Sequence, residues 1–392
     1  MHNLSDTKGF MGGLHPSATL SITSKAKAMK AEGIDVISMC AGEPDFDTPQ
    51  IIKDAAIEAL QTGKTAYTPA SGMPELRKAV AEKFKKDNGI DTAMANVIVA
   101  PGAKFSVFTA IAALCGPGDE VIMPAPYWVS YPEIIQAAGA KMVVVQTRAE
   151  NNFEIDPVDL EAAVTPNTRL LILNSPSNPT GSVYSKESLE AIAAVAVKHN
   201  FMVLSDEIYE KLVYDADQPH VSIASLNPEI ADLTITVNGL SKAYAMTGWR
   251  LGYLTAPEWL AKKIAALQSH TTSNPTTFAQ YGALKALEAA DDEVEKMRQA
   301  FSRRRDLIFD LINAIDGVSA PRPSGAFYIF CDISSFGLNS DDFCAKLLEE
   351  KLVAAIPGAP FGADGWIRMS YACSDENICE ACKRLSDFCA SL

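Results

Sequence analysis

Seven short apolar segments alternate with stretches of helical periodicity across the middle of the chain. Apolar runs of this length are typical of strands buried on both faces, because helices cover both sides of a parallel sheet. The segments are 97–101, 120–124, 141–146, 169–174, 201–206, 234–238 and 252–255, with amphipathic stretches such as 186–199 between several of them. The pattern predicts an α/β fold built on a mostly parallel, seven-stranded sheet.

The remaining sequence predicts a second, smaller α+β unit. A long helical pattern at 288–315 is followed by apolar segments at 325–332 and 365–371 and a helical pattern at 340–351. A chain of 392 residues exceeds what one core usually organises, at roughly 150 residues per domain. We therefore predict a large domain at 46–287 and a small domain at 288–392 that includes the connecting helix. Residues 1–45 are expected to form an arm and part of the small domain.

The charge balance excludes a general nucleic-acid binder. The chain has 34 Lys and Arg against 48 Asp and Glu, a formal net charge of -14, so as a whole it repels phosphate backbones. The basic triplet 303–305 stands close to many acids and is typical of a solvated or interface face. No segment has the roughly 20 apolar residues of a membrane span, and the first residues lack a secretory pattern. We expect a cytoplasmic enzyme that binds neither nucleic acid nor membrane.

The cysteines and histidines predict no metal site. Eight cysteines are scattered, and a single CxxC pair, Cys379 and Cys382, would need a second close pair to hold a structural zinc. Ile378, Cys382, Leu385 and Cys389 instead fall on one face at helical spacing. Of the alternatives, buried thiols, a metal site or redox chemistry, the spacing favours buried thiols. The five histidines are dispersed, without metal or triad spacing.

Familiar phosphate and hydrolase motifs are absent, so the chemistry has to rest on other residues. The sequence contains no GxGxxG, GxxxxGK[ST], GxSxG or HExxH. Four polar residues instead stand at or after the ends of predicted strands: Lys104, Asn178, Asp206 and Lys242. Open α/β sheets bind ligands at this edge. The shared placement of the four residues predicts a site.

Each of these segments offers a distinct chemical function. PGAK at 101–104 places a glycine where a strand opens a helix, which leaves first-turn amides free for an anion. Asp206 ends an apolar strand, where a buried carboxylate needs a cationic partner such as a protonated ring nitrogen. Lys242 is expected to be partly desolvated, with the lowered pKa that Schiff-base lysines require. Arg250 is near enough in sequence to bind a phosphate at the same site.

The proline-rich loop SPSNPTG at 175–181 adds an asparagine held by a stiff backbone. Two prolines and a glycine in so short a loop would fix the Asn178 side chain, and such a loop admits a cis peptide. A lysine, an acid for a pyridinium, a phenol, an asparagine and a phosphate site together describe a pocket for pyridoxal 5'-phosphate (PLP).

The chain resembles the class I aminotransferases, which have the aspartate aminotransferase fold, fold type I of the PLP enzymes. The resemblance runs from about Pro16 to the C-terminus and is greatest to the bacterial and plant branch that includes prephenate aminotransferases. It rests on eight motifs: AGEPDFDTP, YTPASG, PGAK, PAPYWVSYPE, SPSNPTG, SDEIY, GLSKAYAMTGWRLG and WIRMSYA. The resemblance implies a homodimer with shared active sites that acts on amino acids and 2-oxo acids.

The resemblance also implies a role for each matching residue. Lys242 would form the Schiff base with PLP and move the substrate Cα proton, Asp206 would pair with the ring nitrogen, and Tyr209 would hydrogen-bond the phenolic oxygen. The other implied cofactor contacts are Gly102, Ala103 and Arg250 at the phosphate, Asn178 at the phenolic oxygen, Trp128 on the ring, and Tyr67 from a partner subunit. The implied substrate contacts are Gly42, Trp128, Asn178 and Arg368 near the α-carboxylate, and Lys104, Ser17 and Thr19 at a distal carboxylate.

Three positions bear on the substrate and on the phosphate contacts of such an enzyme. In this branch the lysine of PGAK and the PSAT residues bind the distal carboxylate, so Lys104 points to aspartate and glutamate. Prephenate or aromatic substrates are the alternative, but prephenate-using members commonly have a lysine where this chain has His15. Gly239 stands where many relatives have a phosphate-binding serine. Either Ser241 takes its place or the phosphate has one contact fewer.

Two other classes share parts of this pattern. A PLP-dependent lyase would have the same fold and Lys242, but its product would be pyruvate or a cyclised amine. The cofactor-binding domain of a transcriptional regulator would need a DNA-binding module, for which the charge is wrong. We therefore expect an aspartate transaminase, which converts aspartate and 2-oxoglutarate into oxaloacetate and glutamate.

Overall fold

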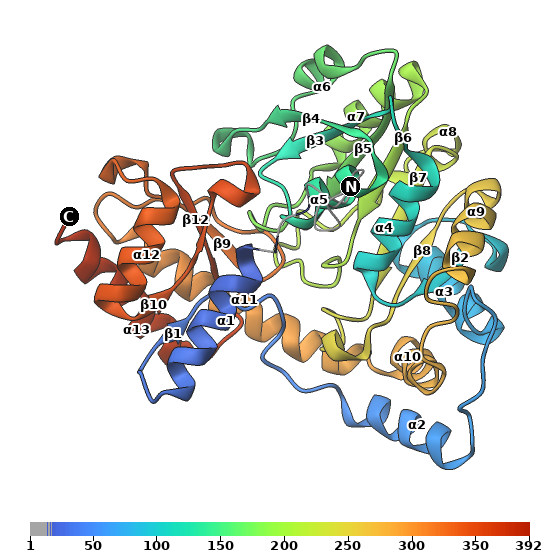
Figure 1. Ribbon diagram of the computed structural model, residues 1–392, viewed down its shortest axis with the longest axis horizontal. Helices are drawn as coiled ribbons and strands as arrows, with labels where there is room; N and C mark the ends of the chain where they lie inside the picture. Colours follow the sequence, from blue (N-terminus) through green and yellow to red (C-terminus); the bar gives the residue numbers. More distant parts are fainter. Residues whose placement is uncertain (1–13, 15, 17) are drawn as a thin grey trace, which may run out of the picture.

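The computed structural model describes residues 14, 16 and 18–392. Its centre is a seven-stranded sheet of order β2-β8-β7-β6-β5-β3-β4 (Figure 1). In that order the strands are Val97–Ala100, Gly252–Thr255, Thr234–Gly239, Met202–Asp206, Thr168–Asn174, Glu120–Ala125 and Lys141–Gln146. From β7 to β4 the neighbours are parallel, whereas β8 is antiparallel to both β2 and β7. The predicted mostly parallel, seven-stranded sheet is confirmed.

Helices cover both faces of this sheet, which explains why its strands read as continuous apolar runs. One face packs against α4 (Ala103–Leu114), α5 (Ser130–Ala138) and α9 (Glu258–Ser269). The other packs against α6 (Pro157–Ala163), α7 (Lys186–His199), α8 (Pro228–Ala231), α3 (Pro74–Asn88) and α10 (Thr277–Ala289). Helix α2 (Gln50–Gln61) lies outside this layer against α10.

Local signals set the ends of the predicted helix 186–199. The Ser185 hydroxyl accepts a hydrogen bond from the Ser188 amide at 3.2 Å and caps the start of α7. Asn200, with a φ of 54°, ends it in the left-handed conformation that asparagine tolerates. The predicted range matches α7.

A smaller sheet forms the second unit. Its order is β11 (Ile356–Pro357), β12 (Trp366–Ser370), β9 (Tyr328–Asp332), all antiparallel, and α12 (Ser340–Lys351) and α13 (Asp375–Cys389) pack on it. Near the N-terminus, α1 (Ala18–Ala31) leads into β1 (Ile37–Ser38), which pairs in parallel with β10 (Val353–Ala354). The N-terminal segment therefore adds to this unit, while the domain boundaries stay a prediction.

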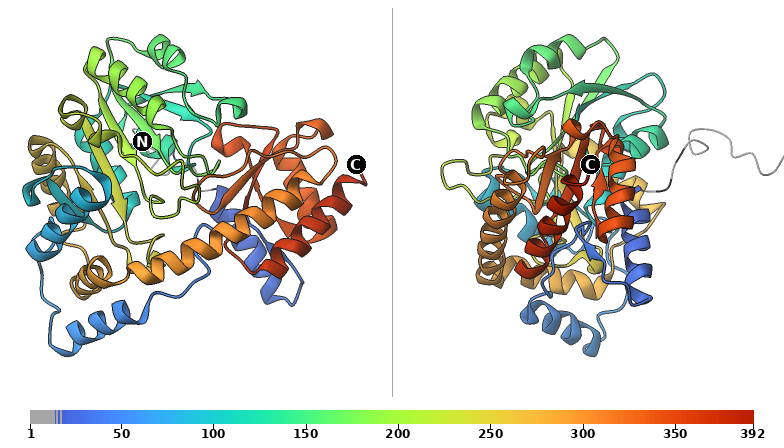
Figure 2. Two further views of the ribbon diagram at one scale, coloured as in Figure 1. Left: turned by 180° about the vertical axis from the view of Figure 1, so that it is seen from behind. Right: turned by 90° about the vertical axis from the view of Figure 1, so that its left-hand side faces the viewer.

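The helix predicted at 288–315 is wrong at its start. Helix α10 ends at Ala289, and α11 spans Asp291–Asn313. Ala290 between them has φ -113° and ψ 14°, which interrupts the helical path. The apolar periodicity hides this break because Ala286, Ala290 and Val294 all pack into the same core. Figure 2 shows α11 running from the large sheet's side of the molecule into the small unit.

The basic triplet lies at the junction of the two units. Arg304 pairs with Asp45 at 2.8 Å and Asp375 at 3.3 Å, and Arg305 pairs with Asp215 at 3.2 Å. Both side chains are largely buried, whereas Arg303 is exposed. The interface role is therefore the one the structure shows for two of the three arginines.

The cysteine-rich C-terminal segment is the helix that its spacing predicts. In α13, Ile378, Cys382, Leu385 and Cys389 are buried while Cys379 is exposed, and all eight cysteines are unpaired. Within residues 14, 16 and 18–392, every helix is too short or too polar to span a bilayer.

Candidate active site

A cavity of about 680 Å³ opens at the carboxyl ends of the parallel strands. Its walls come from the large sheet and from the small unit. The four residues that sequence placement singled out, Lys104, Asn178, Asp206 and Lys242, all line it. The strands bring them together although Lys104 and Lys242 stand 138 positions apart in the sequence.

The Lys242 ammonium is held at the cavity wall. Its Nζ donates to the backbone oxygen of Gly42 at 2.5 Å and lies 5.8 Å from the centre of the Tyr209 ring. Burial lowers the pKa of Lys242 to about 8, with the charges of Glu43 opposing and of Arg250 assisting this shift. The predicted desolvation with a lowered pKa is therefore present in the structure.

Asp206 ends β6 and is 4% exposed. Burial raises its pKa from 3.8 to about 6, although hydrogen bonds to its carboxylate act in the opposite direction. One oxygen accepts from the Tyr131 hydroxyl at 2.9 Å and the other from the Ile208 amide at 3.3 Å. No ion pair to Asp206 occurs within the part of the chain that the structure describes. The charge of Lys242 acts on the carboxylate without pairing with it directly, so its burial still calls for a cationic partner in contact.

An anion cradle forms where β2 meets α4. Gly102 precedes the helix with a φ of 93°, and no side chain caps the first-turn amides. A Cβ at Gly102 would lie 2.4 Å from the Arg250 guanidinium, and one at Gly252 would lie 2.2 Å from the Ala103 nitrogen. Only glycines permit this close approach of backbone, arginine and helix end. Ser241 lines the same cavity.

Gly239, the position that departs from the family pattern, lies beside this cradle. It pairs with Gly252 across β7 and β8, and a Cβ there would lie 3.0 Å from the Gly252 Cα. A side chain at 239 would therefore press against the strand that supports the cradle.

A buried arginine, Arg368, also lines the cavity. Arg368 is 3% exposed and donates to the Asn178 side-chain oxygen at 2.9 Å and to the Cys40 carbonyl at 3.1 Å. Its Nε is buried without a hydrogen-bond partner among the described residues. Asn178 lies between two cis peptides, Ser175-Pro176 and Asn178-Pro179. An unpaired guanidinium nitrogen of this kind suits a bound carboxylate.

Two more predicted residues, Trp128 and Tyr209, line the same space. The Lys104 Nζ lies 4.8 Å from the Trp128 ring centre, and burial together with the charge of Arg250 lowers the pKa of Lys104. The Tyr209 hydroxyl is hydrogen-bonded to that of Tyr328 at 2.8 Å.

One predicted contact, Tyr67, lies off the cavity of its own chain. Tyr67 is 90% exposed and does not line the cavity. Thr19 of α1 does line it, whereas Ser17 and His15 lie outside the described residues.

Comparison with known sequences settles the family. Residues 34–385 match the family described as aminotransferase class I and II. The chain belongs to this family. The aspartate aminotransferase of Geobacillus stearothermophilus is 47% identical over 380 residues, 96% of each chain. The aspartate/prephenate aminotransferase of Cereibacter sphaeroides is 46% identical over 400 residues, 99% of each.

Solved structures show the same fold. The aspartate aminotransferase from Thermus thermophilus with maleate has a TM-score of 0.94 at 45% identity, covering 99% of this chain and 100% of that one. The predicted aspartate aminotransferase fold is confirmed. Aminotransferases of this class depend on PLP, so the predicted cofactor is confirmed too.

The residues of this aminotransferase fit that cofactor. The uncapped helix end beside Arg250 suits a phosphate, and the buried carboxylate of Asp206 suits a protonated ring nitrogen. Lys242 has the depressed pKa that a lysine needs to react as a neutral amine.

Sequence reasoning missed several residues of the aminotransferase cavity. Glu43, Tyr131 and Tyr328 line it, as do Lys27 and Lys30 from α1. Tyr131 stands within the PAPYWVSYPE motif, three residues after Trp128, and its apolar-looking helical position concealed it. Lys27 and Lys30 lie on a helix that only the folded chain brings to the site.

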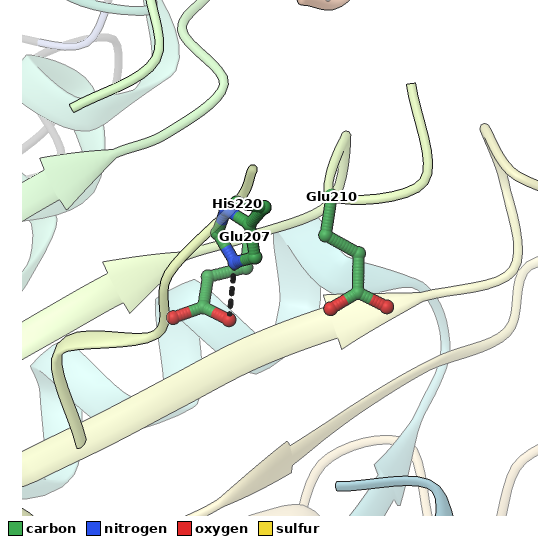
Figure 3. A group of neighbouring side chains, drawn as sticks. All are labelled: Glu207, Glu210 and His220. Atoms are coloured by element: carbon green, nitrogen blue, oxygen red, sulfur yellow. Dashed lines mark hydrogen bonds and ion pairs between the residues drawn. The ribbon is translucent and has the colours of Figure 1, made fainter. Parts of the chain in front are cut away.

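The structure also gathers Glu207, Glu210 and His220, whose ligand atoms lie within 4.8 Å of one another (Figure 3). His220 Nε2 is 3.0 Å from Glu207, while the Lys83 ammonium pairs with Glu210 and the Asn88 amide donates to both glutamates. Although burial opposes it, the charge of Glu207 raises the pKa of His220. A metal would have to displace the Lys83 ammonium, so we interpret this group as an ion-pair network that anchors the segment after β6 to α3.

Proposed function

We propose that this aminotransferase moves the amino group between L-aspartate or L-glutamate and 2-oxo acids. The observation that carries the proposal is that Lys104 and Arg368 line the cavity of Lys242 in addition to Arg250, which we assign to the phosphate, and to Lys27 and Lys30 of α1. A dicarboxylic amino acid has one carboxylate for Lys104 and one for Arg368. The Thermus thermophilus aspartate aminotransferase was solved with maleate, a dicarboxylate, which supports the same chemistry.

Lys242 and Asp206 are the residues to which we assign the chemistry at the cofactor. Bound PLP supplies an electron sink for the electron pair left when the substrate Cα loses its proton. We assign two roles to Lys242 Nζ: attachment of PLP and movement of the Cα proton. Its pKa of about 8 makes the neutral amine accessible. The Asp206 carboxylate would stabilise positive charge on the ring nitrogen, an effect that grows as negative charge enters the ring.

The other assigned residues hold and orient. Arg250, Gly102, Ala103 and Ser241 would hold the phosphate, Tyr209 and Asn178 the phenolic oxygen, and Trp128 the ring face. Arg368, with Asn178 and the Gly42 backbone, would bind the α-carboxylate; Lys104, with Ser17 and Thr19, would bind the distal one. The contacts to the two carboxylates would fix both ends of the substrate and so place its Cα–H bond near Lys242.

We also propose a homodimer whose partner completes each site. Tyr67 is 90% exposed and off its own chain's cavity, as expected of a residue that reaches a partner's site. Helix α2 adds exposed Ile57 and Leu60 to the same region of the chain. Apolar side chains in such positions favour a protein interface.

A cytoplasmic location is part of the proposal. All eight cysteines are unpaired, among them the exposed Cys379. Thiols remain reduced in the cytoplasm, where disulfides are rare.

The aspartate half-reaction tests the proposed substrate. We expect purified, PLP-loaded enzyme to lose the visible absorbance of its bound cofactor when mixed with L-aspartate, with one oxaloacetate released per site. Release of ammonia or carbon dioxide from aspartate while the visible absorbance is kept would indicate a lyase. Unchanged absorbance with aspartate and a change with neutral or aromatic amino acids would contradict the dicarboxylate assignment.

Prephenate is the second candidate acceptor, because the 46% identical relative from Cereibacter sphaeroides is named an aspartate/prephenate aminotransferase. After amino-group transfer from aspartate, the enzyme is offered 2-oxoglutarate or prephenate in separate mixtures. Recovery of the visible absorbance with 2-oxoglutarate and not with prephenate would exclude prephenate as an acceptor.

Substitution Lys104→Met is expected to raise KM for L-aspartate by about tenfold to a hundredfold, because a charged hydrogen bond to the distal carboxylate is lost. L-alanine has no distal carboxylate, so its kcat/KM should change little and serves as the internal control. Steady-state kinetics with both substrates checks the prediction. Equal losses for aspartate and alanine would mean that Lys104 acts on the fold or the cofactor instead.

A further inference from the structure

A tyrosine outside the assigned set makes the closest side-chain contact to Asp206. Tyr131 lies at the start of α5 and is 1% exposed. Its hydroxyl donates to Asp206 Oδ2 at 2.9 Å. Within residues 14, 16 and 18–392, no other side chain donates to this carboxylate. The contact is buried, so water does not compete with it.

The direction of this hydrogen bond is fixed. Burial and the neighbouring charge of Asp206 raise the pKa of Tyr131 well above its ordinary value, so the phenol keeps its proton and donates it. A donor to a carboxylate stabilises the ionised form of that carboxylate. Tyr131 therefore favours the charge that Asp206 would need opposite a protonated ring nitrogen.

The same contact fixes the orientation of the carboxylate. Oδ2 accepts from Tyr131 while Oδ1 accepts from the Ile208 amide at 3.3 Å. Donors on both oxygens set the rotation of the group about its Cβ–Cγ bond. The Tyr131 ring also meets Trp128 edge to face, with centres 5.2 Å apart at 85°. One side chain thus touches both the acid and the aromatic residue assigned to the cofactor ring.

We propose that Tyr131 is a positioning residue that holds Asp206 ionised and correctly rotated for the ring nitrogen of PLP. The proposal rests on the function proposed above. It assigns Tyr131 no contact with the substrate and no transfer of a proton.

The test replaces Tyr131 with phenylalanine and loads the enzyme with PLP labelled with ¹⁵N in the ring. We expect the ring-nitrogen resonance of Tyr131→Phe to move from the position of a protonated pyridine toward that of a neutral one. We also expect kcat with aspartate to fall by about tenfold to a hundredfold, with a smaller change in KM. A purely structural tyrosine would leave the nitrogen resonance where the wild type has it.

Tyr184→Phe is the matched control. Tyr184 is also buried, and its hydroxyl accepts from the Ile155 amide at 3.2 Å, outside the cavity. This variant should keep the wild-type resonance and kcat. If Tyr131→Phe does not fold, Tyr131 is replaced by 3-fluorotyrosine, a more acidic phenol of nearly the same size. A shift of the resonance in the opposite direction, toward the protonated position, supports the proposal. A lack of any shift contradicts it.

The outcomes separate the two proposals. A wild-type enzyme that takes up no PLP, or whose ring nitrogen is neutral, would overturn the assignment of Asp206 itself. A protonated ring nitrogen in the wild type and an unchanged resonance and kcat in Tyr131→Phe would overturn the role of Tyr131 alone.

Discussion

Lys242→Ala is expected to abolish transamination while the protein remains folded. The substitution removes both the amine that attaches PLP and the base that takes the Cα proton, and loss of a general base alone costs about 10²- to 10⁴-fold in rate. The side chain faces the cavity and makes one hydrogen bond, to the Gly42 carbonyl, so its loss leaves little of the core unsupported. Stopped-flow absorbance with aspartate and circular dichroism of the same sample measure the two halves of the prediction.

Lys263→Ala provides the control, because Lys263 is exposed on α9 and does not line the cavity. It should retain wild-type turnover.

The pH dependence gives a further check on Lys242. Its neutral form increases as the pH rises toward about 8, so PLP uptake by the apoenzyme should quicken over that range. Turnover near the wild-type rate in Lys242→Ala would refute the assignment.

Asp206→Ala is expected to lower kcat by about three orders of magnitude or more, since removal of one preorganised charge at a site of developing charge costs about 10²- to 10³-fold and the ring nitrogen would also lose its proton. The phosphate cradle is untouched, so the variant should still bind PLP, with lower affinity. Single-turnover rates and equilibrium dialysis of PLP measure both effects. Asp232→Ala, at an exposed position, is the control.

Replacing Asp206 should lower the activity of the loaded enzyme but raise the stability of the apoenzyme. Burial raises the folded-state pKa of Asp206 from 3.8 to about 6, so the folded chain binds this proton more tightly than the unfolded chain. The resulting penalty is absent below about pH 4 and develops as the pH rises to about 6. Asp206→Asn should therefore stabilise the apoenzyme at neutral pH by up to about 3 kcal/mol, from 1.36 kcal/mol per pKa unit. Thermal unfolding of both apoproteins at pH 4 and pH 7 would show an unchanged difference if this account is wrong.

The large sheet could be predicted from the sequence because each strand is a short apolar run with a clear end. All seven predicted segments contain or overlap the observed strands, and 186–199 and 340–351 match α7 and α12. The break at Ala290 could not be predicted, since the alanine is a good helix former and its apolar side chain continues the periodicity. Its conformation is set by packing against the core between α10 and α11.

Residues at strand ends were predictable, and residues that reach the cavity from helices were not. Asp206 is a charged residue at the end of a largely apolar strand, which is a local signal. Tyr131 carries no such signal, because a tyrosine on a helix beside a sheet is ordinary core material. His220 likewise meets Glu207 through a loop whose path the sequence does not show. The sequence pattern therefore predicts the residues at the edge of the sheet, and it does not predict the helix and loop residues that pack against them, such as Tyr131 and His220.

The cavity is assembled from distant parts of the chain. Lys104 comes from α4, Asp206 from β6 and Lys242 from the turn after β7, whereas Arg368 comes from β12 and Thr19 from α1. Long-range contacts of this kind form late in folding, since the chain must close large loops before they contribute. A ribosome-bound chain from which β12 has not yet emerged therefore lacks Arg368, the residue to which we assign the α-carboxylate. We therefore expect a newly made chain to complete this cavity only after its C-terminal segment has been released, which is later than the large sheet can form.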